Sequence, residues 1–298
     1  MEAFAAKRLL RLLALLPLST SHRLGGILGW WLSVIPNRVR QVASTNLVLC
    51  LPTLSPREHR QLLRQNLMET GKTLMETGAM WLWDCKRLLP LVSKVEGEAA
   101  VQQAFKQGHG VIFLTPHLGA WEIAGLFAAS RYPMTILYRP PRLAGLDPLI
   151  RQARSRSGAR LATTDTAGVR SLVRTLMDGG VLGILPDQEP PKNAGIFAPF
   201  FGVPAYTMVL VARLARRARA PVFIAYCERL SRGAGYHLHF SPISELLAID
   251  PVEESVTAIN RAVERCVKVL PTQYQWCYKR FRRRPPGEPP IYTRSANS

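Results

Sequence analysis

The chain has 298 residues, 47% of them hydrophobic, which is enough for one large α/β domain or for one domain with a helical extension. Its 39 lysines and arginines against 20 acidic residues give a formal net charge of +19, so we expect an anionic partner. Five scattered cysteines without CxxC spacing argue against a disulfide framework and a structural zinc site, and favour a reducing, cytosol-facing environment.

The amino-terminal segment carries an ambiguous membrane signal. Apolar stretches at residues 12–18 and 24–36 flank a polar interruption, and the second contains the adjacent Trp30 and Trp31. Neither stretch approaches the ~18 to 20 residues that span a bilayer, and no small-residue cleavage site marks a signal peptide. We expect helices that lie in the membrane interface, with an ordinary buried helical hairpin as the alternative.

The order of the expected elements predicts the fold class. Residues 3–83 have helical patterns, including a helix start at Ser55-Pro56. Expected strands then cover residues 92–95, 111–114, 134–138, 181–185 and 222–227, with 236–240 as an edge strand. Expected helices cover residues 98–106, 118–129, 146–156, 169–177, 208–217 and 252–269. This alternation predicts an α/β fold in which helices flank a central mixed, largely parallel sheet.

Three regions follow from this pattern. Residues 1–83 form the expected helical membrane-associating region, and residues 84–281 form the α/β domain. Residues 282–298, rich in proline, arginine and glycine, are expected to form a loose tail.

His117 and Glu122 lie in the stretch FLTPHLGAWEIAG, which follows the expected strand 111–114. On one helix, a spacing of five residues would turn the two side chains about 140° apart, and they could not meet. They can meet if His117 lies in the strand-to-helix turn and Glu122 in the first turns of the helix. A carboxylate bonded to one imidazole nitrogen raises the basicity of the other, as a general base requires. The alternative is a helix-capping histidine and a solvated glutamate.

Other site patterns are missing from the sequence. It contains no HExxH zinc motif, no GxSxG serine elbow and no GxxxxGK[ST] phosphate loop. His237 and His239 alternate on the expected edge strand, but no neighbouring carboxylate or thiolate has an obvious spacing. We therefore predict no metal site.

Six blocks of the sequence, in order, resemble the bacterial late acyltransferases of lipid A biosynthesis, a lauroyl/myristoyl transferase family of the lysophospholipid-acyltransferase-like superfamily. The blocks are NLVLCLPTLS, TPHLGAWEIAG, LYRP, GILPDQEP, GIFAPFFGVPAYT and QYQWCYKRF, so the likeness covers nearly the whole chain. His117 and Glu122 match the HX4D/E signature of glycerolipid acyltransferases. The resemblance implies transfer of a laurate- or myristate-class chain from acyl carrier protein to a hydroxyacyl chain of a Kdo-bearing lipid A precursor. It also implies a location at the cytoplasmic face of the inner membrane.

The resemblance implies a mechanism without a cofactor, a metal or a covalent acyl-enzyme, because a thioester is already activated. His117 would take the proton of the acceptor hydroxyl, and Glu122 would orient and stabilise the imidazolium, as the carboxylate does in a Ser-His-Asp triad. Two other acceptors of the same chemistry stay open: a lysophospholipid and a mannosylated phosphoinositide. No motif of nucleic-acid recognition is present, so no nucleic-acid partner is expected.

Further site residues are expected near the ends of strands. Arg139 follows the strand 134–138 and is expected to bind substrate phosphate or the developing oxyanion. Arg154 and Arg156 belong to the cluster RQARSRSGAR, which suits anionic groups of the substrate. Asp187 and Gln188 match the PDQ block of the family, where related acyltransferases hold the acceptor. Solvated arginines and ordinary turn residues are the alternatives.

Two other groups of residues are expected to contact lipid or the donor. Three phenylalanines in an uncharged block are expected to line a groove for the acyl chain, with core packing as the alternative: Phe197, Phe200 and Phe201. One basic group is expected to meet lipid headgroups or carrier protein: Arg213, Arg216 and Arg217. A second is expected to meet anionic membrane lipids: Lys279, Arg280, Arg282, Arg283 and Arg284.

Overall fold

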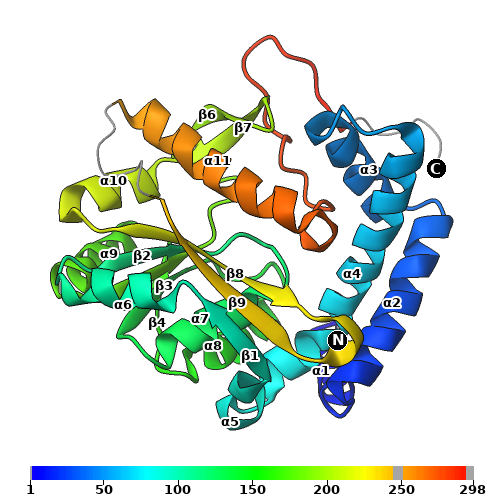
Figure 1. Ribbon diagram of the computed structural model, residues 1–298, viewed down its shortest axis with the longest axis horizontal. Coiled ribbons are helices and arrows are strands. Elements are labelled where there is room, and N and C mark those ends of the chain that lie inside the picture. Colours follow the sequence, from blue (N-terminus) through cyan, green and yellow to red (C-terminus); the bar gives the residue numbers. More distant parts are fainter. Residues whose placement is uncertain (1, 244–250, 293–298) are drawn as a thin grey trace.

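The computed structural model describes residues 2–243 and 251–292. Its amino-terminal helices are α1 (Glu2–Ala14), α2 (Leu18–Val34), α3 (Arg38–Cys50) and α4 (Pro56–Leu82). Figure 1 shows α2, α3 and α4 side by side at one end of the molecule, next to the α/β part. As predicted, α4 begins at Ser55-Pro56. Its start is a capping box, because Ser55 and Glu58 each bond the other's backbone N–H. Within the described ranges, no helix combines the length and the apolar character needed to cross a bilayer.

The α/β part is built on a seven-stranded sheet with the order β1-β9-β8-β2-β5-β3-β4. Its strands are β1 (Val92–Glu96), β2 (Val111–Leu114), β3 (Met134–Tyr138), β4 (Arg160–Thr163), β5 (Val181–Ile184), β8 (Val222–Arg229) and β9 (Tyr236–Pro242). All neighbouring strands are parallel except β8 and β9. This confirms the predicted central sheet, which is mixed and largely parallel. A separate antiparallel pair joins β6 (Gly195–Phe200) to β7 (Val203–Met208).

Helices cover both faces of this sheet. They are α5 (Cys85–Leu88), α6 (Glu98–Lys106), α7 (Trp121–Ala129), α8 (Asp147–Ser155), α9 (Thr166–Met177), α10 (Leu210–Ala218) and α11 (Val252–Val269). Strand β2 is buried along its whole length: Phe113 packs in a core with α6 and α7, whereas Ile112 and Leu114 pack in a core with α9, α10 and α11. An apolar run buried on both sides is what a central parallel strand requires.

The structure differs from the sequence-based expectation at three places. Strand β9 is not an edge strand, because β1 pairs in parallel with its outer side. Helix α7 begins at Trp121 rather than at residue 118, since Leu118 and Gly119 form bridges to Tyr274 and Cys227. Strand β4 and the β6–β7 hairpin lie in segments for which no strand was predicted.

The carboxy-terminal segment 270–292 packs back onto the amino-terminal helices. The side-chain amide of Asn46 donates to the carbonyls of Trp276 and Tyr278 at 2.7 and 2.8 Å. In the same way Asn66 donates to the carbonyls of Thr272 and Tyr274 at 2.9 and 2.7 Å. The described part of the expected tail ends with Ile291 and Tyr292 against the core. Residues 293–298 of that tail lie outside the described residues.

A buried ionic network joins the helical end to the sheet. Arg229 of β8 donates to Glu69 at 2.9 Å and to Glu76 at 3.0 Å, both on α4. Glu76 also bonds His22 of α2 at 2.8 Å and the Tyr236 hydroxyl of β9 at 3.0 Å. Burial alone would raise the pKa of Glu76, but the charge and hydrogen bonds of Arg229 and His22 outweigh it and hold that pKa at about 2.

Replacing Arg229 tests the buried ionic network between α4 and the sheet. Arg229→Met leaves the Glu76 carboxylate buried without its main cation, which should lower the free energy of unfolding by about 3–5 kcal/mol at pH 7. The same change at exposed Arg232 should have almost no effect. Denaturant titration of both variants checks the expectation, and equal stabilities would contradict it.

The same network predicts a dependence on pH. The pKa of Glu76 is lower in the folded protein than its ordinary value of 4.5. The ionised carboxylate therefore stabilises the fold above pH 4.5, and this stabilisation is lost as the pH falls toward about 2. Glu76→Gln should therefore flatten the loss of stability across this acid range. An acid profile identical to that of the wild type would contradict the assignment.

Candidate active site

Two residues at the carboxyl edge of the sheet form the centre of the site. Strands β2 and β5 pair in parallel with Leu114 opposite Ile184. His117 and Asp187 are each the third residue beyond this pair, and each follows a proline. A proline cannot donate to the next rung of the ladder, so both chains leave the sheet here. Loops at this edge are where open α/β sheets place their ligands.

Both carboxylate oxygens of Asp187 bind His117. The backbone N–H of His117 donates to Oδ2 at 2.9 Å, and Nδ1 of the imidazole lies 2.8 Å from Oδ1. Burial alone would raise the pKa of Asp187, but the charge and both hydrogen bonds of His117 outweigh it and hold that pKa below its usual range. The ionised carboxylate is an acceptor only, so Nδ1 carries the proton of the neutral imidazole.

The other imidazole nitrogen faces an amide. Nε2 of Gln188 lies 3.1 Å from Nε2 of His117 and 3.3 Å from Oε1 of Gln275. With Nδ1 protonated, Nε2 of His117 accepts this hydrogen bond through its lone pair. The backbone N–H of Gln275 donates to the His117 carbonyl at 3.0 Å, so the carboxy-terminal segment also fixes the turn. A hydroxyl that replaces the Gln188 amide would meet an imidazole ready to accept its proton.

The structure pairs Glu122 with Arg154 rather than with His117. Nε of Arg154 donates to Glu122 Oε2 at 3.0 Å, and Nη2 of Arg154 donates to Oε1. Burial alone would raise the pKa of Glu122, but Arg154 outweighs it, and this pKa is lowered. The charge of His117 makes a smaller contribution to this lowering. The expected direct contact is not formed because Glu122, in the first turn of α7, reaches toward α8; its catalytic role stays a prediction.

The other predicted arginines lie in different settings. Arg139 is exposed directly after β3, at the carboxyl edge of the sheet. Arg156 donates to the backbone carbonyl of Met80 near the carboxyl end of α4 at 2.7 Å, and to that of Ala153 on α8 at 2.9 Å. Arg280 is buried and donates to the Tyr206 carbonyl at 2.7 Å, so it is not part of a surface patch. Substrate-binding roles for Arg139, Arg154 and Arg156 stay predictions.

The three predicted groove residues lie around the β6–β7 hairpin. Phe200 is fully buried, with its ring 6.2 Å from that of Tyr274. The ring of Phe201 lies 5.9 Å from that of Trp276, and the ring of Phe197 5.3 Å from that of Tyr206. Their role in holding an acyl chain stays a prediction.

A mostly apolar cavity lies beside the Glu122–Arg154 pair. It is lined by Thr115, Trp121, Glu122, Gly125, Leu126, Met134, Ile136, Arg154, Gly183 and Leu185. Trp121 also contacts the turn that carries His117, with its ring 5.0 Å from the His117 ring. The cavity thus begins near the imidazole and extends between α7 and the sheet.

Comparison with known proteins decides the family. The model of the bacterial lipid A biosynthesis acyltransferases matches residues 2–283. The chain belongs to this family. It is therefore an acyltransferase, and its reaction belongs to lipid A biosynthesis.

Curated relatives of this acyltransferase differ in the acyl chain that their names specify. A lipid A biosynthesis lauroyltransferase of Escherichia coli (strain K12) is 29% identical over 278 residues, which cover 93% of this chain and 90% of the relative. A palmitoleoyltransferase of the same organism is 29% identical over 256 residues, which cover 86% of this chain and 82% of the relative. A myristoyltransferase, also of that organism, is 26% identical over 262 residues, which cover 86% of this chain and 79% of the relative.

The His117–Asp187 pair gives a testable prediction for the acyltransferase. Asp187→Asn places an amide donor at Nδ1 and favours the wrong tautomer, so kcat should fall by roughly 10³- to 10⁴-fold, as in serine proteases. Asp178→Asn, a change at an exposed aspartate, should leave kcat unchanged. Acyl-transfer assays on both purified variants, with circular dichroism as the fold control, check this. Near-normal turnover of Asp187→Asn would contradict the tautomer assignment.

Proposed function

We propose that this acyltransferase moves a fatty acyl chain of the laurate or myristate class from acyl carrier protein to a hydroxyl of a hydroxyacyl chain on a Kdo-bearing lipid A precursor. The proposal is supported most directly by the imidazole of His117, whose Nδ1 bonds Asp187 while Nε2 faces the side-chain amide of Gln188. The membership in the lipid A family supports the acceptor. The formal net charge of +19 fits an acidic carrier protein and an anionic lipid.

In the proposed reaction, the acceptor hydroxyl replaces the Gln188 amide at Nε2 of His117. The imidazole takes the hydroxyl proton while the oxygen attacks the thioester carbonyl, and Asp187 stabilises the resulting imidazolium. The tetrahedral intermediate then expels the carrier's thiolate, which recovers the proton from His117. Proton transfer of this kind contributes about 10²- to 10⁴-fold, and positioning of two large substrates supplies much of the remainder.

Glu122 keeps a catalytic role in this proposal, but it acts differently from a direct partner of the imidazole. Its charge favours the imidazolium through space, and its two bonds to Arg154 hold that guanidinium at the wall of the apolar cavity. In this proposal Arg154 orients the thioester end of the acyl donor. In this proposal the HX4E motif has two functions: His117 acts as the base, and Glu122 anchors Arg154.

Variants of the motif test the mechanism. His117→Ala should abolish transfer, and Glu122→Ala should do the same. Since Glu122→Ala also leaves Arg154 buried without its anion, Glu122→Gln is the matched variant: it keeps the shape but removes the charge. Transfer of labelled acyl chains from acyl carrier protein, measured on folded protein, checks this. Near-normal turnover of His117→Ala would contradict the mechanism, whereas equal transfer to a lysophospholipid would contradict only the proposed acceptor.

We also propose that Arg139 binds a phosphate of the acceptor or the developing oxyanion. It is exposed at the same sheet edge as His117, and its guanidinium suits either charge. Arg139→Ala should raise KM or lower kcat by about 10-fold or more, as expected for loss of one charged hydrogen bond. Exposed Arg142 is the matched control, and Arg142→Ala should change neither constant. Identical steady-state constants for the two variants would reject this role.

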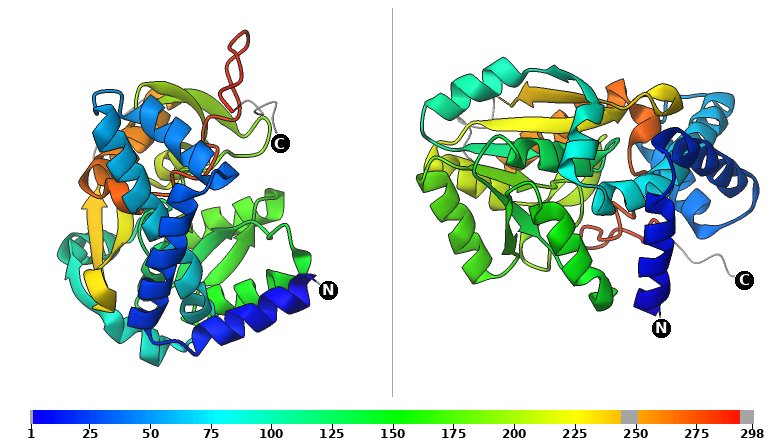
Figure 2. Two further views of the ribbon diagram at one scale, coloured as in Figure 1. Left: turned by 90° about the vertical axis from the view of Figure 1, so that its right-hand side faces the viewer. Right: turned by 90° about the horizontal axis from the view of Figure 1, so that it is seen from below.

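Membrane association at the cytoplasmic face of the inner membrane is proposed for the amino-terminal helices. Large apolar side chains are exposed along α1, α2 and the residues that end them: Phe4, Leu9, Leu12, Leu15, Leu24, Ile27, Trp30, Trp31, Val34 and Ile35. Figure 2 shows α1 and α2 on the outside of the molecule, with α1 extending away from α2. Helices of this kind lie in the membrane interface with their apolar face among the lipids.

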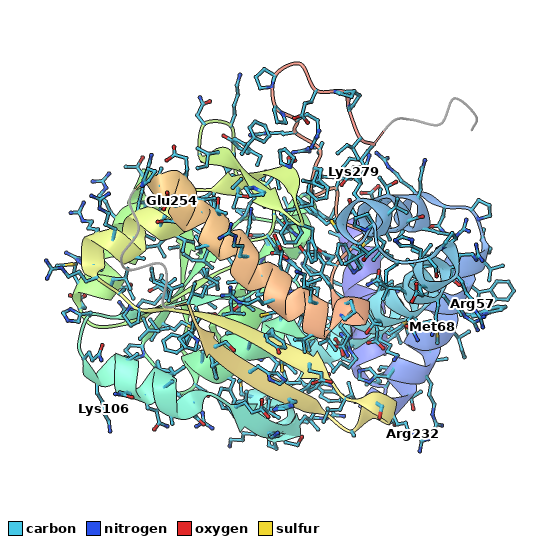
Figure 3. The ribbon with its side chains drawn as sticks, turned by 45° about the horizontal axis from the view of Figure 1, so that its top comes forward. Arg57, Met68, Lys106, Arg232, Glu254 and Lys279 are labelled. Atoms are coloured by element: carbon cyan, nitrogen blue, oxygen red, sulfur yellow. The ribbon has the colours of Figure 1, made fainter. Side chains whose placement is uncertain are left out.

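A groove next to this apolar surface carries positive charge. Arg23, Lys72 and Arg232 line it together with Ile27 and Met68. Figure 3 shows Met68 on the helical end and Arg232 at the turn between β8 and β9. Cations beside exposed apolar side chains suit the headgroups of anionic lipids.

Charged substitutions test the membrane surface. Ile27→Glu and Trp31→Glu should each weaken binding to anionic vesicles by about 10-fold or more, because a large apolar side chain can no longer enter the lipid. Met177, which is 66% exposed on α9, offers the matched control. Vesicle sedimentation checks this, and an equal loss of binding in Met177→Glu would contradict a localised surface.

A further inference from the structure

Two histidines and two glutamates meet on the outer strands of the sheet, apart from the His117 site. His237 and His239 alternate on β9 and therefore share one face of it. Strand β1 brings Glu96 opposite His239, and strand β8 brings Glu228 opposite His237. The parallel pairing of β1 with β9 thus supplies the carboxylate that the local sequence around the histidines lacks.

The spacing of these side chains matches that of metal ligands. Oε1 of Glu96 lies 3.3 Å from Nε2 of His237, and Oε2 of Glu96 lies 3.3 Å from Nδ1 of His239. One ligand atom from each of these three residues lies within 4.8 Å of the other two. In a tetrahedral zinc site with bonds of about 2.0–2.1 Å, neighbouring ligand atoms lie about 3.3–3.4 Å apart.

Glu228 completes the arrangement from the opposite side. Its Oε2 lies 3.8 Å from Nδ1 of His237 and 3.5 Å from Nε2 of His239, the nitrogens that do not face Glu96. A histidine that binds a metal usually donates its other ring N–H to a carboxylate. Glu228 therefore lies on the side of both rings that faces away from Glu96, within a short side-chain movement of their outer nitrogens.

One ring nitrogen that faces the proposed metal position is also unsatisfied. Nε2 of His237, on the side of Glu96, is buried and has no hydrogen-bond partner within the described part of the chain. The two rings lie 3.9 Å apart, and His239 stacks on Tyr226 at 4.5 Å, so packing holds them in place. Burying imidazole nitrogens without partners is costly unless another ligand satisfies them.

We propose that Glu96, His237 and His239 bind a divalent transition-metal ion, with Zn²⁺ as the best fit, and that Glu228 accepts the remaining ring N–H groups. Two imidazoles and a carboxylate suit zinc and its neighbours rather than Mg²⁺ or Ca²⁺. Lys94 also contacts Glu96, but its side chain is 61% exposed and can swing into solvent when the metal binds. The ion would fasten edge strand β1 to β9 and β8.

Metal binding by the untagged, full-length protein in detergent, after chelator treatment and dialysis, tests this proposal. We expect about one equivalent of Zn²⁺ per chain in calorimetry, a higher melting temperature with Zn²⁺, and visible absorption of a low-coordinate site with Co²⁺. His237→Gln and His239→Gln should each weaken Zn²⁺ binding more than about 100-fold, and Glu228→Gln about 10- to 100-fold.

Two further variants keep the result decisive. His109 is exposed in a turn of the same domain, so His109→Gln should bind Zn²⁺ like the wild type. Glu96→Gln alters a half-exposed side chain and leaves the paired histidines intact, so it tests the site even if a histidine variant fails to fold. Failure of the wild type to bind Zn²⁺ or Co²⁺ would overturn the proposal, as would binding by Glu96→Gln equal to that by His109→Gln. Neither outcome bears on acyl transfer.

Discussion

The contact between Asp187 and His117 is the interaction on which the account of the active site depends. One carboxylate oxygen fixes the backbone of the turn and the other fixes Nδ1 of the imidazole. The contact exists because β2 and β5 are parallel neighbours and their last residues, Leu114 and Ile184, lie opposite each other. The fold therefore determines the tautomer, and the tautomer determines which nitrogen can act as a base.

The amino-terminal helices support the candidate active site as well as forming the proposed membrane surface. Through Asn46 and Asn66 they hold the segment that carries Gln275, and Gln275 bonds both the His117 carbonyl and the Gln188 amide. The buried network around Glu76 fastens the same helices to the sheet. The proposed membrane surface and the imidazole of His117 are thus linked through one set of contacts, which would keep a lipid at these helices in a fixed relation to the candidate site.

Sequence reasoning predicted the sheet and its helices well because buried strands and amphipathic helices leave strong local patterns. It predicted His117 for the same reason, since a histidine after an apolar strand lies at the carboxyl edge of the sheet. It selected Glu122 as the direct partner because the two residues are close in sequence and match the HX4D/E signature. The contact of His117 with Asp187 depends instead on strand order. A signal for the contact between His117 and Asp187 was present in the sequence, because both residues follow a proline directly after strands of similar length. Glu96 shows the same limit of local sequence patterns, since nothing near it in the sequence points to His239.

The most direct test of the central claim is the protonation state of His117 in the resting enzyme. Long-range ¹H–¹⁵N correlation spectra of protein with ¹⁵N-labelled histidine distinguish the two neutral tautomers, and His117→Gln assigns the signal. The account predicts a neutral ring with the proton on Nδ1 and a free lone pair on Nε2. A neutral ring with the proton on Nε2 would contradict it, because that nitrogen could not then accept the proton of the acceptor hydroxyl.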